Sequence, residues 1–149
     1  MKKTLQYLLI ACLLTTYIFI GSCIGDNDET EIVELLQTWI LQSFGKIGEE
    51  PPLILDTEIT IQFNEENRVE GFSGCNQYFG QYRAKDDGTL SFRDLAMTEM
   101  ACLRPEGVMI IEQRYLDALA DVSAYEIEEN RLRLFYDEGQ SVLNYTVKQ

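Results

Sequence analysis

The chain of 149 residues carries 12 basic and 25 acidic side chains, a formal net charge of −13 at pH 7, and no histidine. Such an acidic balance disfavours binding to nucleic acid and to anionic lipid headgroups. The lack of histidine removes the commonest general base and the commonest zinc ligand, and it excludes Ser-His and Cys-His nucleophile systems. We therefore expect no enzyme activity, no catalytic residues, no metal and no cofactor.

Residues 1–22 have the features of a secretory signal that ends at a lipoprotein cleavage site. Two lysines precede an apolar run at residues 5–20, and Gly21-Ser22 stand directly before Cys23. Small residues at these positions suit the peptidase that processes lipoproteins, and Cys23 would receive acyl chains such as palmitate. We predict a lipid-anchored protein. An ordinary signal peptide and an uncleaved membrane anchor are the alternatives.

Residues 23–37 are predicted to form the lipidated cysteine, an acidic tether and a short helix at Glu31–Gln37. Loss of the two lysines of the signal would leave 10 basic and 25 acidic residues, a net charge of 10 − 25 = −15. Ile24 follows the cysteine, so the inner-membrane retention signal of enteric bacteria is absent. In a bacterium with two membranes we expect outer-membrane placement, facing the periplasm or, because the tether resembles some Bacteroidetes export signals, the cell surface.

Residues 38–149 are predicted to form one domain made mainly of short antiparallel strands. The apolar alternation places them at Trp39–Leu41, Glu58–Phe63, Arg68–Phe72, Phe79–Arg83, Thr89–Phe92, Ala124–Ile127, Arg131–Tyr136 and Val142–Val147. Acidic pairs beside Asn or Gly predict hairpin turns between strands at Glu65-Glu66, Asp86-Asp87, Glu128-Glu129 and Asp137-Glu138. Paired catalytic carboxylates or a calcium site are the alternative interpretation of these acids.

Three glycines within ten residues indicate a backbone that turns through positive φ or approaches a neighbour too closely for a Cβ: Gly71, Gly74 and Gly80. Asn76 also tolerates left-handed geometry. The residues that follow alternate, with Tyr78 and Tyr82 on one side of a strand. The segment therefore predicts a tight corner that leads into a strand.

The pattern G-x-x-G-C-N-x-Y-x-G-x-Y, followed by T-x-M-A-C, resembles the META domain family, which includes HslJ-like heat-shock and envelope lipoproteins. The residues that carry it are Gly71, Gly74, Cys75, Asn76, Tyr78, Gly80, Tyr82, Thr98, Met100, Ala101 and Cys102. Flanking matches extend it from Trp39 to Tyr145. The family resemblance implies structural or binding roles for the motif and a stress-related envelope function. Phe135-Tyr136 depart from the family pattern, which leaves open the register of the hairpin between the strands predicted at Arg131–Tyr136 and Val142–Val147.

Two cysteines remain once Cys12 is removed with the signal and Cys23 is lipidated. In an oxidising compartment this even remainder points to a disulfide between Cys75 and Cys102, which the family motif places at comparable corners. Two free buried thiols or a redox pair are the alternatives.

One helix is predicted to begin near Pro105. Val108, Tyr115 and Leu119 recur at helical spacing on its apolar face, while Glu112 is assigned mostly to the wet side. The predicted fold is an α+β domain with a strongly curved, barrel-like antiparallel sheet and one covering helix. The META resemblance implies the same fold.

Two functions are compatible with these features. The first is a non-enzymatic, membrane-anchored protein that binds or stabilises another envelope protein. The second, suggested by the likeness of the META fold to pilot lipoproteins, is a carrier of a lipid or acyl chain, with Tyr78 and Tyr82 as candidate lining residues of its cavity.

Overall fold

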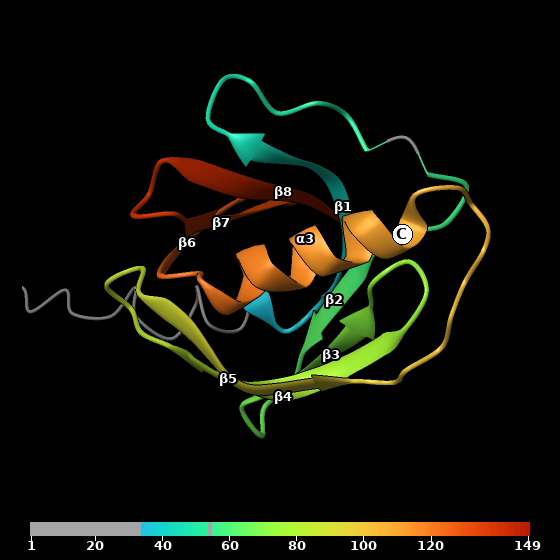
Figure 1. Cartoon of the computed structure of the whole chain (residues 1–149). Coiled ribbons are helices and arrows are strands. Elements are labelled where there is room, and N and C mark those ends of the chain that lie inside the picture. The colour runs from blue at the N-terminus through green and yellow to red at the C-terminus, as the bar shows by residue number, and fades with distance from the viewer. Residues whose placement is uncertain (1–33, 54) are drawn as a thin grey trace, which may run out of the picture.

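The computed structural model of the protein describes residues 34–53 and 55–149 (Figure 1). The predicted signal segment, Cys23 and the acidic tether lie outside the described residues. Residues 31–33 of the short helix predicted at Glu31–Gln37 also lie outside them. In the described remainder of that predicted helix, Glu34 and Leu35 are helical.

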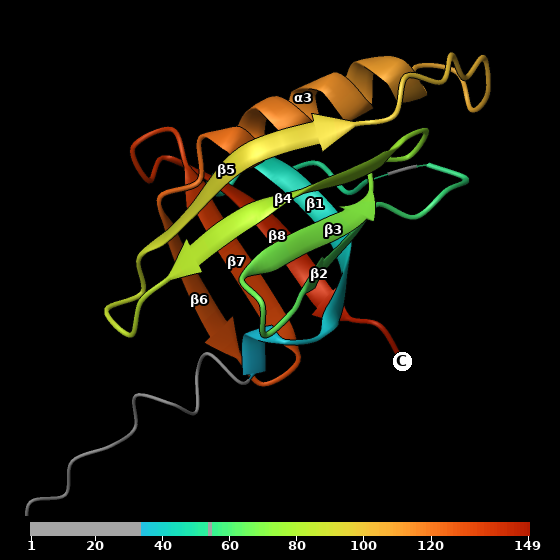
Figure 2. The same cartoon turned by 90° about the horizontal axis from the view of Figure 1, so that it is seen from below.

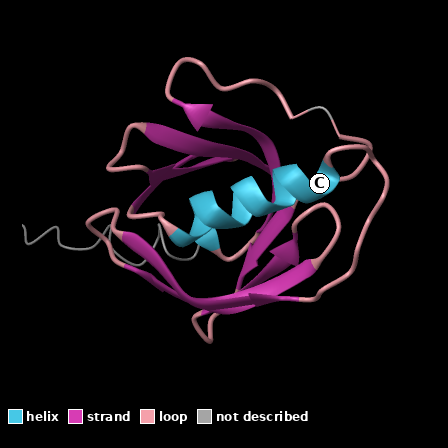
Figure 3. Ribbon diagram, in the orientation of Figure 1, coloured by secondary structure: helices cyan, strands magenta, loops and turns pink. Residues whose placement is uncertain are grey.

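Strands dominate the described part of the chain, and one long helix interrupts them (Figure 3). In chain order the elements are β1 (Thr38–Lys46), β2 (Thr60–Phe63), β3 (Arg68–Phe72), β4 (Gln77–Ala84), β5 (Leu90–Met97), α3 (Val108–Ala120), β6 (Ala124–Glu128), β7 (Arg131–Tyr136) and β8 (Ser141–Val147). The strands form one antiparallel eight-stranded sheet in the order β5-β4-β3-β2-β1-β8-β7-β6.

The sheet curls until its two edge strands, β5 and β6, meet at one end. An isolated bridge joins Thr89 to Ala124, and the amide of Tyr125 donates a hydrogen bond to the carbonyl of Gly88 at 2.8 Å. Helix α3 lies across the open side of the curled sheet (Figures 1 and 2). The predicted α+β fold, with a barrel-like sheet and one covering helix, is confirmed.

The acidic pairs lie at the hairpins, as predicted. The turns after β2, β4, β6 and β7 contain left-handed residues, which are Asn67 at φ 58°, Gly88 at 78°, Glu129 at 55°, and Asp137 and Glu138 at 54° and 53°. In the β7–β8 hairpin Tyr136 pairs with Ser141, which settles the register that the sequence left open.

Strand β5 continues to Met97, well beyond the predicted end at Phe92. The register between β4 and β5 shifts opposite Gly80, and Asp94 has φ 52°. This β-bulge breaks the two-residue alternation from which the strand was predicted, so the sequence pattern ended too early.

The core lies inside the curl, between the sheet and α3. Trp39 of β1, Leu119 of α3 and Leu132 of β7 are fully buried there. Val108 and Tyr115 are buried as predicted, but the assignment of Glu112 to the wet side is wrong, because its side chain is only 1% exposed. A buried carboxylate must be satisfied by hydrogen bonds, and its partners define the candidate site.

Candidate functional site

The corner between β3 and β4 requires glycine at two of its positions. A Cβ at Gly71 would collide with the carbonyl oxygen of Thr60 and lie 2.6 Å from the hydroxyl oxygen of Tyr78. Gly74 has φ +106°, and a Cβ there would lie 3.1 Å from Val108 of α3. The first half of the motif therefore allows the corner to pack tightly against β2 and the start of α3.

Asn76 connects the two halves of the motif. Its Nδ2 donates to Oε1 of Glu112 at 2.7 Å and to the carbonyl of Met100 at 3.2 Å. Its Oδ1 accepts hydrogen bonds from the Thr98 hydroxyl at 2.8 Å and the Met100 amide at 2.7 Å. Its φ is not positive, so Asn76 does not adopt the left-handed geometry that asparagine tolerates. Asparagine suits this position because its side-chain amide donates and accepts hydrogen bonds at the same time.

Glu112 accepts hydrogen bonds from the corner. The backbone N–H of Asn76 donates to Oε2 of Glu112 at 2.8 Å, and the Ser73 hydroxyl donates to the same oxygen. No salt bridge involves Glu112 among the described residues. Burial raises the pKa of Glu112, but the hydrogen bonds from Ser73, Asn76 and the Cys75 backbone outweigh burial and hold the pKa below its ordinary value. Glu112 is thus an ionised anchor between α3 and the corner.

Glu112 was missed because acidic side chains on helices usually face water. A signal for its burial was nevertheless present, since Glu112 lies four residues after Val108 and three before Tyr115, on the same helical face. An acid in register with an apolar stripe, in a chain with a glycine-rich corner, indicates a buried acceptor of backbone amides.

A disulfide joins the same two segments. The sulfur atoms of Cys75 and Cys102 are 2.00 Å apart, and their Cα atoms are 5.9 Å apart. Ala101, the remaining motif residue, is exposed. The disulfide and the Asn76 network together hold the segment between β5 and α3 against the corner.

The motif tyrosines are part of the buried core. The Tyr78 hydroxyl donates to the carbonyl of Thr60 at 2.9 Å and lies 2.7 Å from the Tyr115 hydroxyl, and the Tyr82 hydroxyl donates to the carbonyl of Asn64 at 2.9 Å. Burial raises the pKa of Tyr78 well above its ordinary value and that of Tyr115 to about 12. Both tyrosines are thus buried in the core, and Tyr78 also borders a shallow pocket on the outer face of the sheet.

The segment held by the network exposes apolar side chains. Of the seven large apolar side chains that are exposed in the described part of the chain, five lie within Met97–Ile110, which are Met97, Met100, Leu103, Met109 and Ile110. Leu103 is 92% exposed. We call these five side chains the apolar rim. Exposed apolar side chains that lie this close together in the sequence are a candidate interaction surface.

Two further properties concern metals and membranes. Within residues 34–53 and 55–149, no three His, Cys, Asp or Glu side chains are grouped so that they can hold a metal ion. Across the same residues, no helix has the length and apolarity needed to cross a membrane.

The curled sheet, the covering helix and the disulfide-linked corner define a small α+β domain whose motif residues serve mainly as internal supports. The chain belongs to the META domain family, whose sequence pattern matches residues 33–149. This membership confirms the resemblance on which the sequence interpretation relied. No curated protein matches the chain.

The solved structures that are similar to this chain include one determined by NMR and one determined by crystallography. A protein from Burkholderia xenovorans, determined by NMR, is 26% identical, with a TM-score of 0.63 over 89% of this chain and 97% of that one. A DUF4847 family protein from Bacteroides vulgatus, determined by crystallography, is 14% identical, with a TM-score of 0.61 over 78% of this chain and 96% of that one. The second similarity shows a shared fold only.

Proposed function

We propose that the protein is a non-enzymatic lipoprotein of the bacterial envelope, anchored by acyl chains on Cys23, whose META domain binds another envelope protein through the apolar rim. The observation that carries the binding part of this proposal is the concentration of exposed apolar side chains in one segment that a disulfide and a buried network hold in place. A rigid apolar surface loses little conformational freedom on binding, which favours affinity.

The position of the apolar rim supports this proposal. The described chain enters the domain at residue 34, and the segment between β5 and α3 lies at the opposite end of the domain (Figure 2). A domain tethered through its amino terminus would therefore present the apolar rim away from the anchor. A stress-related role is part of the proposal only through membership of the META family.

Site-specific photo-crosslinking of the full-length protein in intact cells tests the partner. A photoreactive residue at Leu103 is expected to give a discrete protein adduct, and one at Glu49, an exposed position outside the apolar rim, is expected to give none. A second substitution in the apolar rim, Ile110→Asp, should abolish the Leu103 adduct without lowering the melting temperature, because Ile110 is 67% exposed. Equal adducts from both positions, or an unchanged Leu103 adduct in Ile110→Asp, would contradict the proposal.

A further inference from the structure

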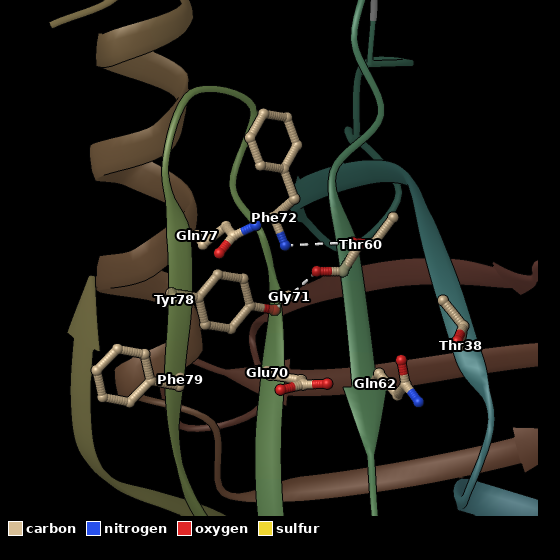
Figure 4. A pocket seen from close by; sticks show the side chains of 9 residues that line it. All are labelled: Thr38, Thr60, Gln62, Glu70, Gly71, Phe72, Gln77, Tyr78 and Phe79. Atoms are coloured by element: carbon tan, nitrogen blue, oxygen red, sulfur yellow. Dashed lines mark hydrogen bonds between the residues drawn. The ribbon is translucent and has the colours of Figure 1, made fainter. Parts of the chain in front are cut away.

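A second surface lies on the outer face of the sheet, over strands β1 to β4 (Figure 4). It is a shallow pocket of about 330 Å³, which falls in the range of small-molecule sites, roughly 300–1,000 Å³. Its floor consists of strands and not of loops, so its side chains keep fixed spacings. No residue of the apolar rim lines it.

The sheet register arranges the outward side chains of this pocket in two rows. The first row, read across β1 to β4, is Thr38, Gln62, Glu70 and Phe79. The second row, read across β2 to β4, is Thr60, Phe72 and Gln77. Neighbouring strands lie about 4.8 Å apart, and residues two apart on one strand lie about 6.6 Å apart. The rows therefore form a regular grid of polar groups with a phenylalanine in each.

Three polar side chains of this grid lack partners within the described residues, whereas the Thr60 hydroxyl oxygen accepts a hydrogen bond from the Phe72 amide. In residues 34–53 and 55–149, the side chains of Gln62, Glu70 and Gln77 make no hydrogen bond or ion pair. Figure 4 shows Glu70 and Gln62 side by side between Phe79 and Thr38. Phe79 is 49% exposed, although its strand β4 pairs with a neighbouring strand on each side. Donors and acceptors are thus available next to an uncovered aromatic ring.

The surface continues on the other side of Phe79. That ring also borders a second pocket, of about 600 Å³, whose lining includes Arg68, Gln81 and Asp94. Arg68 pairs across the strands with Gln81, so the second pocket adds a third row to the same face. Two pockets that share one aromatic ring suit an elongated ligand with repeating units.

We infer that this face binds a neutral glycan, with the rings of successive sugars placed on either side of Phe79. Amide and carboxylate side chains match the hydroxyl groups of a sugar, which both donate and accept hydrogen bonds. The phenyl ring supplies a flat apolar surface for the C–H face of a sugar ring. No lysine or arginine lines the first pocket, and the net charge of −13 disfavours an anionic polymer. An acyl chain would bury the amides without partners, which is costly.

Isothermal titration calorimetry of the full-length protein in detergent tests this inference. The probes are neutral hexasaccharides of α-linked glucose, β-linked glucose, β-linked N-acetylglucosamine and mannose. At least one is expected to bind with a Kd below about 1 mM. Phe79→Ala should weaken that binding about tenfold, because an aromatic contact is removed. Leu103→Ala, in the apolar rim, is the matched control and should leave the Kd unchanged.

Several outcomes would overturn the inference. These are the absence of binding below about 1 mM by any of the four probes, or an unchanged Kd in a folded Phe79→Ala variant. If Phe79→Ala does not fold, Gln62→Ala replaces it, because the exposed Gln62 side chain has no internal partner. A photoreactive residue at Phe79 that forms adducts only with protein would also overturn it. Since Leu103 and Phe79 are tested separately, failure here leaves the proposed protein partner unaffected.

Discussion

Glu112 is the residue at which the helix, the corner and the second half of the motif meet. Its carboxylate accepts hydrogen bonds from Ser73 and Asn76. The Asn76 side chain in turn accepts a hydrogen bond from the Met100 amide. An acid with these partners contributes to stability.

Replacement of Glu112 by alanine should lower the free energy of unfolding by about 1–3 kcal/mol, because buried donors on Ser73 and Asn76 lose their acceptor. Chemical denaturation measures this change. The matched control is Glu106→Gln, at an exposed position just before the helix, which should change the free energy by less than about 0.5 kcal/mol. Equal effects of the two substitutions would show that the hydrogen-bond network of Glu112 contributes nothing to the free energy of unfolding.

Stability should also depend on pH through Glu112. The pKa of its carboxyl is lowered in the folded state, so its contribution is present above the unfolded pKa of about 4.3 and is lost as pH falls through the folded value. The difference in unfolding free energy between wild type and Glu112→Gln should therefore be largest near neutral pH and shrink in acid. Denaturation curves at several pH values measure it, and a difference that grows in acid would contradict the assignment.

At the scale of elements, the segment between β5 and α3 depends on the disulfide for its position. Cys75 and Cys102 are separated by 27 residues, and closing a loop of this length contributes roughly 3–3.5 kcal/mol by chain entropy. The double substitution Cys75→Ala, Cys102→Ala should lower the free energy of unfolding by up to about this amount. Denaturation with and without reductant measures it, and wild type should respond to reductant while the variant should not.

Amide hydrogen exchange distinguishes a local effect from a global one. In the double variant, protection should fall in residues 98–107, while β7 and β8, which lie on the other side of the sheet order, should keep most of theirs. Uniform loss of protection would mean that the disulfide stabilises the whole domain and does not specifically hold the segment.

The sequence predicted those elements whose pattern is local. Asp87-Gly88 predicted a hairpin because a left-handed residue is required there, and Gly88 has φ 78°. The strand alternation around Tyr78 and Tyr82 is also a local pattern, because side-chain direction follows from strand geometry alone, and it was predicted from the sequence. The motif glycines also had the packing roles that their residue type indicates.

Features that depend on contacts between distant segments were not predictable in this way. Glu112 is buried because Ser73 and Asn76, nearly forty residues earlier, supply donors. The tyrosine hydroxyls have partners on other elements, so Tyr78 could not be assigned to core or cavity from its strand. The rows of the outer face appear only when the registers of four strands are known together.

At the scale of the whole molecule, the predicted anchor and the domain would have separate tasks. Acyl chains on Cys23 would hold the protein on a membrane without help from its acidic surface, because each buried methylene contributes about 0.8 kcal/mol. The domain surfaces are then free for ligands. Cys23→Ala should abolish incorporation of labelled palmitate and shift the protein from the membrane to the soluble fraction. A variant that still labels and sediments with membranes would contradict lipidation at Cys23.

The most direct test of the protein as a lipid-anchored envelope module is mass spectrometry of the native protein extracted from membranes without reductant. We expect a mature chain that begins at Cys23 and carries acyl chains, with Cys75 and Cys102 in one disulfide-linked peptide. A chain that retains residues 1–22, or that has an unmodified Cys23 and free thiols, would contradict both the anchor and the oxidising location on which the proposed function depends.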